Sequence, residues 1–65
     1  MNDALLNQAL RLHQAGQLAE AARIYGTILQ TNPRHFQALY LLGFAHFQAG
    51  AFADAERLIG EALKL

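Results

Sequence analysis

The sequence predicts an all-α fold, a fragment of an α-solenoid made of four antiparallel helices. Three observations support this prediction: alanine and leucine dominate the composition, valine is absent, and the few helix breakers are evenly spaced. Alanine and leucine are strong helix formers, whereas β-branched residues favour strands. The breakers are Gly16, Asn32 with Pro33, and Gly50, and cutting the chain there leaves four segments of helical length.

Local sequence signals support each of the four predicted helices. The first covers about residues 3–15, where apolar side chains recur at helical spacing, and Gly16 suits the left-handed residue that follows a helix end. The second covers 18–31, because Pro33 disfavours helical backbone at Asn32. The third covers 35–49 and ends before Gly50, and the fourth covers 52–65.

Length and charge exclude several classes of protein. The chain has 65 residues, five basic and five acidic, so its formal net charge is zero, and 54% of its residues are hydrophobic. It can form only one small domain, and it lacks the positive charge that binds nucleic acid or an anionic membrane surface. No cysteine is present to form a disulfide. Because we find neither an export signal nor a long apolar run, we expect a cytoplasmic protein.

An internal repeat organises the chain. A shift of 34 residues aligns residues 2–31 with 36–65 without a gap, and ten of the aligned pairs are identical, including Gly16 with Gly50 and Ala21 with Ala55. A helix-turn-helix unit with this period is a specific signal. The sequence therefore resembles the tetratricopeptide repeat family, as a single module with repeat 1 at about 2–35 and repeat 2 at about 36–65, the second lacking a C-terminal capping helix.

The second repeat matches the family pattern, and the first repeat matches it more loosely. Repeat 1 carries Leu5, Gln8, Ala9, Leu12, Ala21, Tyr25 and Pro33 at the pattern positions, and repeat 2 carries Leu39, Leu42, Gly43, His46, Ala55 and Ile59. The small residues of the pattern let the two helices of a repeat approach closely. Leucine replaces the tryptophan of the pattern in both repeats, and Gln8 stands where the pattern has leucine, as suits a first repeat.

The resemblance implies a concave groove, lined by the first helix of each repeat, that binds proteins or peptides. The residues at the groove positions are Leu6, Asn7, Leu10, His13, Gln37, Tyr40, Phe44, Phe47 and Gln48. Leucines occupy the places where one subfamily clamps a carboxylate, so we expect an apolar helix or extended segment as the partner. The alternative is that these aromatic residues pack against another helix of the same polypeptide.

The C-terminal end is the second candidate surface. A solenoid is stabilised by stacking of neighbouring repeats, and its last helix is normally polar on the outside. Here the last helix is apolar, and no polar helix covers its apolar residues, which are Leu58, Ile59, Ala62, Leu63 and Leu65. We expect either that further helices follow in a longer protein or that the chain forms a homo-oligomer, including a helix-exchanged dimer.

The sequence offers little catalytic chemistry. No serine or cysteine is present, and three histidines are far apart, so we expect no enzyme activity, no cofactor and no metal site. His46 is expected to be buried and hydrogen-bonded. His13 is expected to be an exposed histidine without a special role, or else a source of pH-sensitive association.

Two other repeated features have structural interpretations. Acidic and basic residues recur three apart, as Glu20 with Arg23 and Asp54 with Arg57, and we expect both pairs to be surface ion pairs. A glycine recurs within the second helix of each repeat, and we expect it to face solvent, although it could instead admit another helix.

The functional expectation is a protein–protein interaction or self-association module. The alternative is based on a likeness in composition and not on a mechanism. Alanine- and leucine-rich repeats of this kind are similar to arrays at the N-terminus of bacterial glycosyltransferases of the O-GlcNAc-transferase type. In that case the chain is the non-catalytic front part of a larger enzyme.

Overall fold

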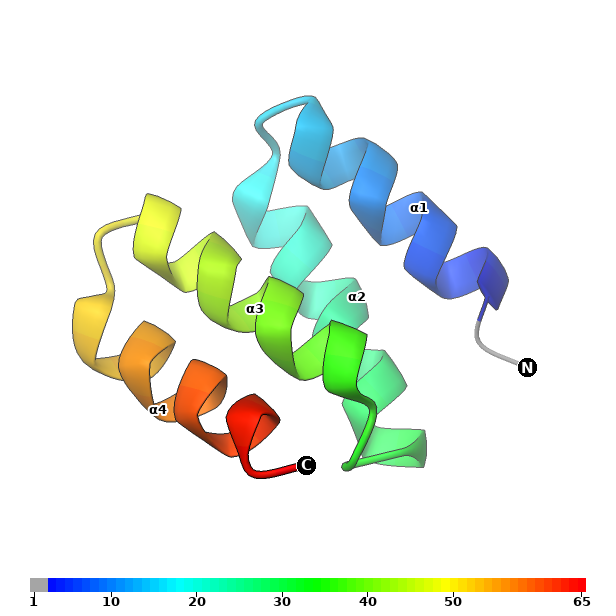
Figure 1. Ribbon diagram of the computed structural model, residues 1–65. Coiled ribbons are helices and arrows are strands. Elements are labelled where there is room, and N and C mark those ends of the chain that lie inside the picture. Colours follow the sequence, from blue (N-terminus) through cyan, green and yellow to red (C-terminus); the bar gives the residue numbers. More distant parts are fainter. Residues whose placement is uncertain (1–2) are drawn as a thin grey trace.

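The computed structural model describes residues 3–65 and consists of four α-helices that lie side by side in chain order (Figure 1). They are α1 (Asp3–Gln14), α2 (Leu18–Thr31), α3 (Phe36–Gln48) and α4 (Phe52–Leu63). Each helix packs against the next one along the chain. The Cα atoms fill a slab of 27 × 25 × 14 Å. The predicted all-α fold is confirmed, with helix boundaries within two residues of those expected.

The first helix of each repeat ends in the same way. Gly16 has a φ of 84°, and the two amides after α1 bond back into the helix: Gln17 N–H donates to the carbonyl of Leu12 at 2.9 Å and Gly16 N–H to that of His13 at 3.0 Å. The same pair of bonds recurs after α3, around Gly50 with its φ of 88°. Glycine adopts this left-handed backbone without the strain that a side chain would add, so it sets both turns.

Side-chain hydrogen bonds fix the turn between the two repeats. The Asn32 carboxamide oxygen accepts from the backbone N–H of Arg34 at 3.3 Å. His35 caps α3, because its Nδ1 accepts from the backbone N–H of Ala38 at 3.1 Å and so satisfies a free donor of the first turn. His35 is therefore a structural residue.

Most of the buried hydrophobic residues form two clusters. The first joins α1 and α2 to the start of α3 and contains Leu6, Ala9, Ala21, Ile24, Tyr25, Ile28 and Ala38. The second joins α3 to α4 and contains Leu39, Leu58 and Ala62. The first cluster is the larger because three helices contribute buried residues to it, whereas two helices contribute to the second.

Three residues expected on binding surfaces lie in this core. Leu6 was expected in the groove, and Leu58 and Ala62 on the C-terminal face, but all three are buried. Leu6 is covered because α2 and α3 contribute to the cluster that surrounds it. Leu58 and Ala62 pack on Leu39 of α3, inside their own repeat. Their expected roles as surface residues are corrected accordingly.

One of the two expected ion pairs forms. Arg23 and Glu20 lie 3.1 Å apart, as predicted. Arg57, however, pairs with Glu61 at 3.3 Å, and not with Asp54. Residues three and four apart are both neighbours on a helix, so the spacing alone could not decide between the two acids. Both pairs are exposed and contribute little to stability.

The repeated mid-helix glycines Gly26 and Gly60 are predicted to be unfavourable for stability. A Cβ at either position would have no atom within 4 Å outside the local helix. Replacing each with alanine should therefore raise the free energy of unfolding by about 1 kcal/mol, since alanine orders more easily in a helix. Thermal unfolding followed by circular dichroism measures this. A loss of stability in either variant would show that a neighbouring helix needs the space.

Candidate protein-binding surface

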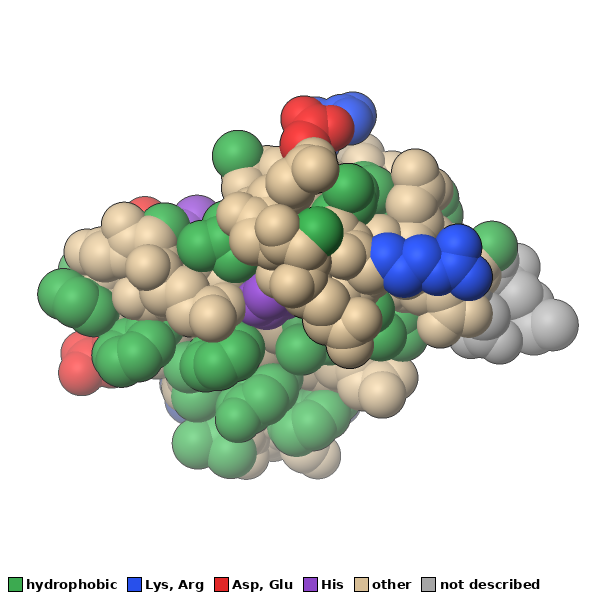
Figure 2. All heavy atoms as spheres, turned by 90° about the horizontal axis from the view of Figure 1, so that it is seen from above, with side chains coloured by type: hydrophobic (Ala, Val, Ile, Leu, Met, Phe, Trp, Pro, Cys, Tyr) green, Lys and Arg blue, Asp and Glu red, His purple; other side chains and the backbone are tan. Residues whose placement is uncertain are grey.

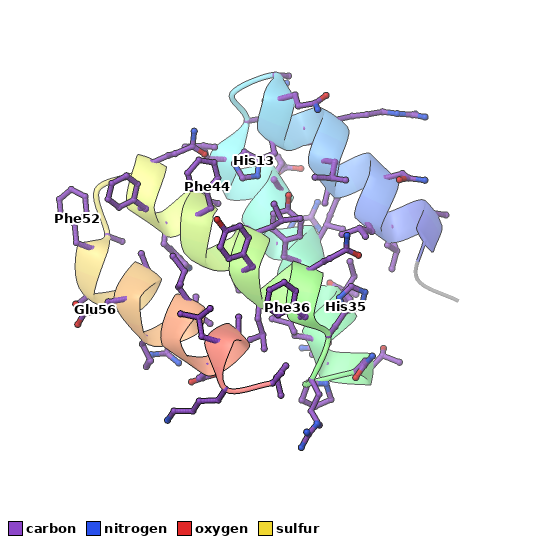
Figure 3. The ribbon with its side chains drawn as sticks, in the orientation of Figure 1. His13, His35, Phe36, Phe44, Phe52 and Glu56 are labelled. Carbon is purple, nitrogen blue, oxygen red and sulfur yellow. The ribbon has the colours of Figure 1, made fainter. Side chains whose placement is uncertain are left out.

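Four aromatic side chains follow one side of α3, and we call them the aromatic row: Phe36, Tyr40, Phe44 and Phe47. Their spacing of four, four and three residues places them on one helix face. Each is between 41% and 53% exposed. Figure 3 shows Phe36 and Phe44 on the same side of α3, and in Figure 2 hydrophobic side chains gather along one edge of the molecule. Such a contiguous apolar surface is typical of an interaction site.

Each ring of the aromatic row contacts another ring, either within the row or beside it. Phe36 and Tyr40 stack with their centroids 6.1 Å apart and an angle of 8° between the rings. Phe47 meets Phe52, the first residue of α4, edge to face at 5.4 Å. Phe52 is 62% exposed and extends the aromatic row onto α4. Aromatic pairs in such geometries stabilise each other beyond their simple burial.

His13 connects the two repeats beneath the aromatic row. Its ring lies 5.7 Å from that of Phe44, its Nδ1 is 3.0 Å from the Tyr25 hydroxyl, and its Nε2 bonds to Gln48 Oε1. The amide oxygen of Gln48 can only accept, so Nε2–H donates to it; in the tautomer with its proton on Nε2, Nδ1 accepts from the Tyr25 hydroxyl. The expectation of an exposed histidine is wrong: His13 is half-buried and bonded at both ring nitrogens.

Tyr25 is the largest fully buried side chain of the core. Burial of its hydroxyl raises the pKa of Tyr25 above the ordinary value of 10.0, because the phenolate would lose hydration. The hydrogen bond with His13 keeps this hydroxyl partnered inside the protein. A core residue of α2 therefore holds the imidazole that lies against Phe44 of the aromatic row.

The remaining groove residues surround the aromatic row in different ways. Asn7, Gln37 and Gln48 are exposed and offer amide groups. Leu10 is half-buried and packs against the first core cluster. The structure therefore gives the expected groove a surface of aromatic rings and amides, without an exposed leucine at position 6.

The C-terminal surface is smaller than expected. Leu63 is 74% exposed and Leu65 is 50% exposed, whereas Ile59 is half-buried against α3. Because Leu58 and Ala62 belong to the core, the apolar surface at this end consists of Leu63, Leu65 and the edge of Ile59.

His46 differs from its expected state. It is half-buried rather than buried, and it lines a cavity of about 240 Å³ between α2 and α3. The other lining residues are small or aliphatic: Leu18, Ala19, Ala22, Ala45 and Ala49. The imidazole therefore borders an open pocket whose other lining residues are apolar.

Two residues of the aromatic surface were not predicted from the sequence. Phe36 lies four residues before Tyr40, so its spacing could have revealed it as the first member of the aromatic row. Phe52 joins through a contact across the turn at Gly50, which helical periodicity cannot show. Within the part of the chain that the structure describes, no three acidic, histidine or cysteine residues cluster as metal ligands, and no helix is long and apolar enough to span a membrane.

Comparison with known proteins agrees with the repeat and the helix pattern. The family model described as Tetratricopeptide repeat matches residues 12–65. None of the curated proteins matches the sequence. The matched region covers the end of α1 and all of α2 to α4, including the aromatic row and its partners His13 and Tyr25. This chain therefore belongs to the tetratricopeptide repeat family.

Proposed function

We propose that the chain is a protein–protein interaction module that binds an apolar protein segment on the aromatic row and has no catalytic activity of its own. Tetratricopeptide repeats generally mediate protein–protein interaction. The observation that carries the specific proposal is the exposed aromatic row on α3, a helix without a single Asp, Glu, Lys or Arg. Aromatic residues in such a setting are the usual anchors of protein interfaces.

The chemistry of the surface specifies the partner. With no charged group on α3, the surface supplies apolar contact area without a preferred sign of charge. The exposed amides of Asn7 and Gln37 can donate to and accept from polar groups at the edge of the partner, and Gln48, whose oxygen bonds to His13, can donate through its NH2 group. An amphipathic helix or an extended apolar strand satisfies both conditions.

A peptide-display selection against the 65-residue chain tests this proposal. We expect enrichment of aromatic and aliphatic peptides with few charges. Tyr40→Glu should weaken their binding at least about tenfold, because it places a charge in the middle of the contact. Leu63→Glu makes a comparable apolar-to-acidic change at a 74% exposed site outside the aromatic row and should leave binding unchanged. Equal binding to wild type and Tyr40→Glu, or the absence of any enriched peptide, would contradict the proposal.

Self-association is a second candidate function, favoured by the exposure of Leu63 and Leu65. Either a homo-oligomer or a helix-exchanged dimer would cover these leucines. This candidate requires that Leu63→Glu alters the mass of the protein in solution.

A further inference from the structure

We propose that the partner on the aromatic row is a second copy of this chain, packed with its α3 antiparallel across a twofold axis. This inference rests on the proposed function, since it takes the aromatic row as the contact surface. It adds the identity of the partner and the orientation of the two helices. It also places self-association on α3 and not at the C-terminal end.

The exposed area is large enough for such a dimer. A phenylalanine or tyrosine presents roughly 200 Å². With the exposures observed for the aromatic row and Phe52, the five rings offer on the order of 500 Å² per chain. Covering all five rings in both copies would remove at most about 1000 Å² of aromatic surface, which is close to the minimum size of a specific protein interface. The C-terminal end offers less, because its exposed surface rests on Leu63 and Leu65.

The charge distribution allows two identical surfaces to meet. The thirteen residues of α3 include no acidic residue, no lysine and no arginine. The two ion pairs lie on the other helices, Arg23 with Glu20 on α2 and Arg57 with Glu61 on α4. Two copies can therefore bring their α3 helices together without placing like charges opposite each other, which would otherwise disfavour self-association.

The spacing of the rings is self-complementary to within one residue. The row runs 36, 40, 44, 47, so a twofold axis that crosses α3 between Tyr40 and Phe44 brings Tyr40 opposite Phe44 of the partner subunit. The same axis brings Phe36 opposite position 48 of the partner subunit, one residue along the helix from Phe47 of the partner subunit. Twofold pairing of one surface with itself is the commonest way in which identical chains assemble.

The rings are already held in place before they meet a partner. Phe36 stacks on Tyr40, and Phe44 lies against His13, which is itself bonded to Tyr25 and Gln48. Side chains ordered in the free chain lose less conformational entropy when they bind. This favours a defined ring-to-ring contact over non-specific adhesion.

Two complementary charged variants test the dimer and its orientation. Sedimentation equilibrium should give wild type twice the 7.2 kDa mass of one chain at high micromolar concentration. Tyr40→Glu and Phe44→Arg should each remain monomeric, because each homodimer would hold two charges against apolar rings. An equimolar mixture of the two should restore the dimer, since the antiparallel arrangement places the new Glu against the new Arg. Leu63→Glu is the control and should dimerise like wild type.

The outcomes separate this inference from the proposed function. A monomeric wild type, a monomeric mixture, or a dimer lost in Leu63→Glu but kept in Tyr40→Glu would each overturn the inference. If displayed peptides nevertheless bind the aromatic row, the proposed function stands without the dimer. Circular dichroism checks that each variant is folded. Should Tyr40→Glu or Phe44→Arg fail to fold, the pair Phe36→Arg and Phe47→Glu makes the same test at the outer positions of the aromatic row.

Discussion

Replacing Tyr25 with alanine should unfold the chain. Tyr25 is completely buried in the first core cluster. Truncating a buried aromatic ring costs about 3–5 kcal/mol. A single core in a chain this small rarely supplies more than about that amount. We expect the far-ultraviolet circular dichroism of Tyr25→Ala to lose its helical signal at room temperature. A helical variant with the melting temperature of wild type would refute this account of the core.

Tyr25→Phe is the matched control, because it keeps the ring and removes only the hydroxyl. It leaves His13 Nδ1 without its hydrogen-bond partner, and a hydrogen bond of this kind contributes about 1 kcal/mol. The variant should remain folded with a slightly lower melting temperature. A loss as large as that of Tyr25→Ala would mean that the hydroxyl, and not the ring, holds the core together.

Ionisation of the same hydroxyl should lower the free energy of unfolding at alkaline pH. Because burial raises the pKa of Tyr25, the unfolded chain releases this proton at a lower pH than the folded chain does. The contribution of Tyr25 to stability is therefore complete below pH 10.0 and is lost as the pH rises above it. Tyr25→Phe has no such proton, so its stability should decline less over that range.

Replacing Gly43 with valine should be the next most damaging change. A Cβ at Gly43 would lie 2.7 Å from Cγ1 of Ile59, 3.2 Å from the carbonyl oxygen of Ala55 and 3.3 Å from the backbone nitrogen of Ile59. The Ile59 side chain can turn away, but the backbone of α4 cannot do so without separating the helices. Overpacking of this kind costs about 1–3 kcal/mol. The loss of unfolding free energy in Gly43→Val, measured by urea titration, should lie at the upper end of this range.

The glycines offer an internal comparison. Gly43→Ala and Gly60→Ala make the same chemical change in adjacent helices of one repeat, yet only Gly43 faces another helix closely. The first should lower the urea midpoint and the second should raise it. If both variants are stabilised, α3 and α4 do not approach each other as closely as the structure shows.

The sequence predicted the helices well because their limits are set locally. The glycine turns at Gly16 and Gly50 and the proline after Asn32 act within a few residues, so they determine the boundaries without knowledge of the tertiary fold. The 34-residue repeat then supplied the pairing of helices, which periodicity within one helix could not.

The composition of the surfaces was harder to predict, because it depends on which helix covers each residue. Leu6 and Tyr40 occupy equivalent positions in the two repeats, yet Leu6 is buried and Tyr40 is exposed. In the first repeat, α3 helps to cover Leu6 on α1. Among residues 3–65, no further helix follows that could cover Tyr40 on α3 in the same way. The bonds of His13 to Tyr25 and Gln48 likewise arise only from tertiary packing.

The central claim is that the aromatic row is the surface through which this protein contacts others. Amide chemical-shift mapping of the isotope-labelled chain, with a display-selected peptide added, tests it most directly. We predict that the largest shift changes fall on α3 around Tyr40 and Phe44 and on His13 of α1, with little change in α2. Changes that instead concentrate at Leu63 and Leu65, or along the exposed side of α2, would contradict the claim.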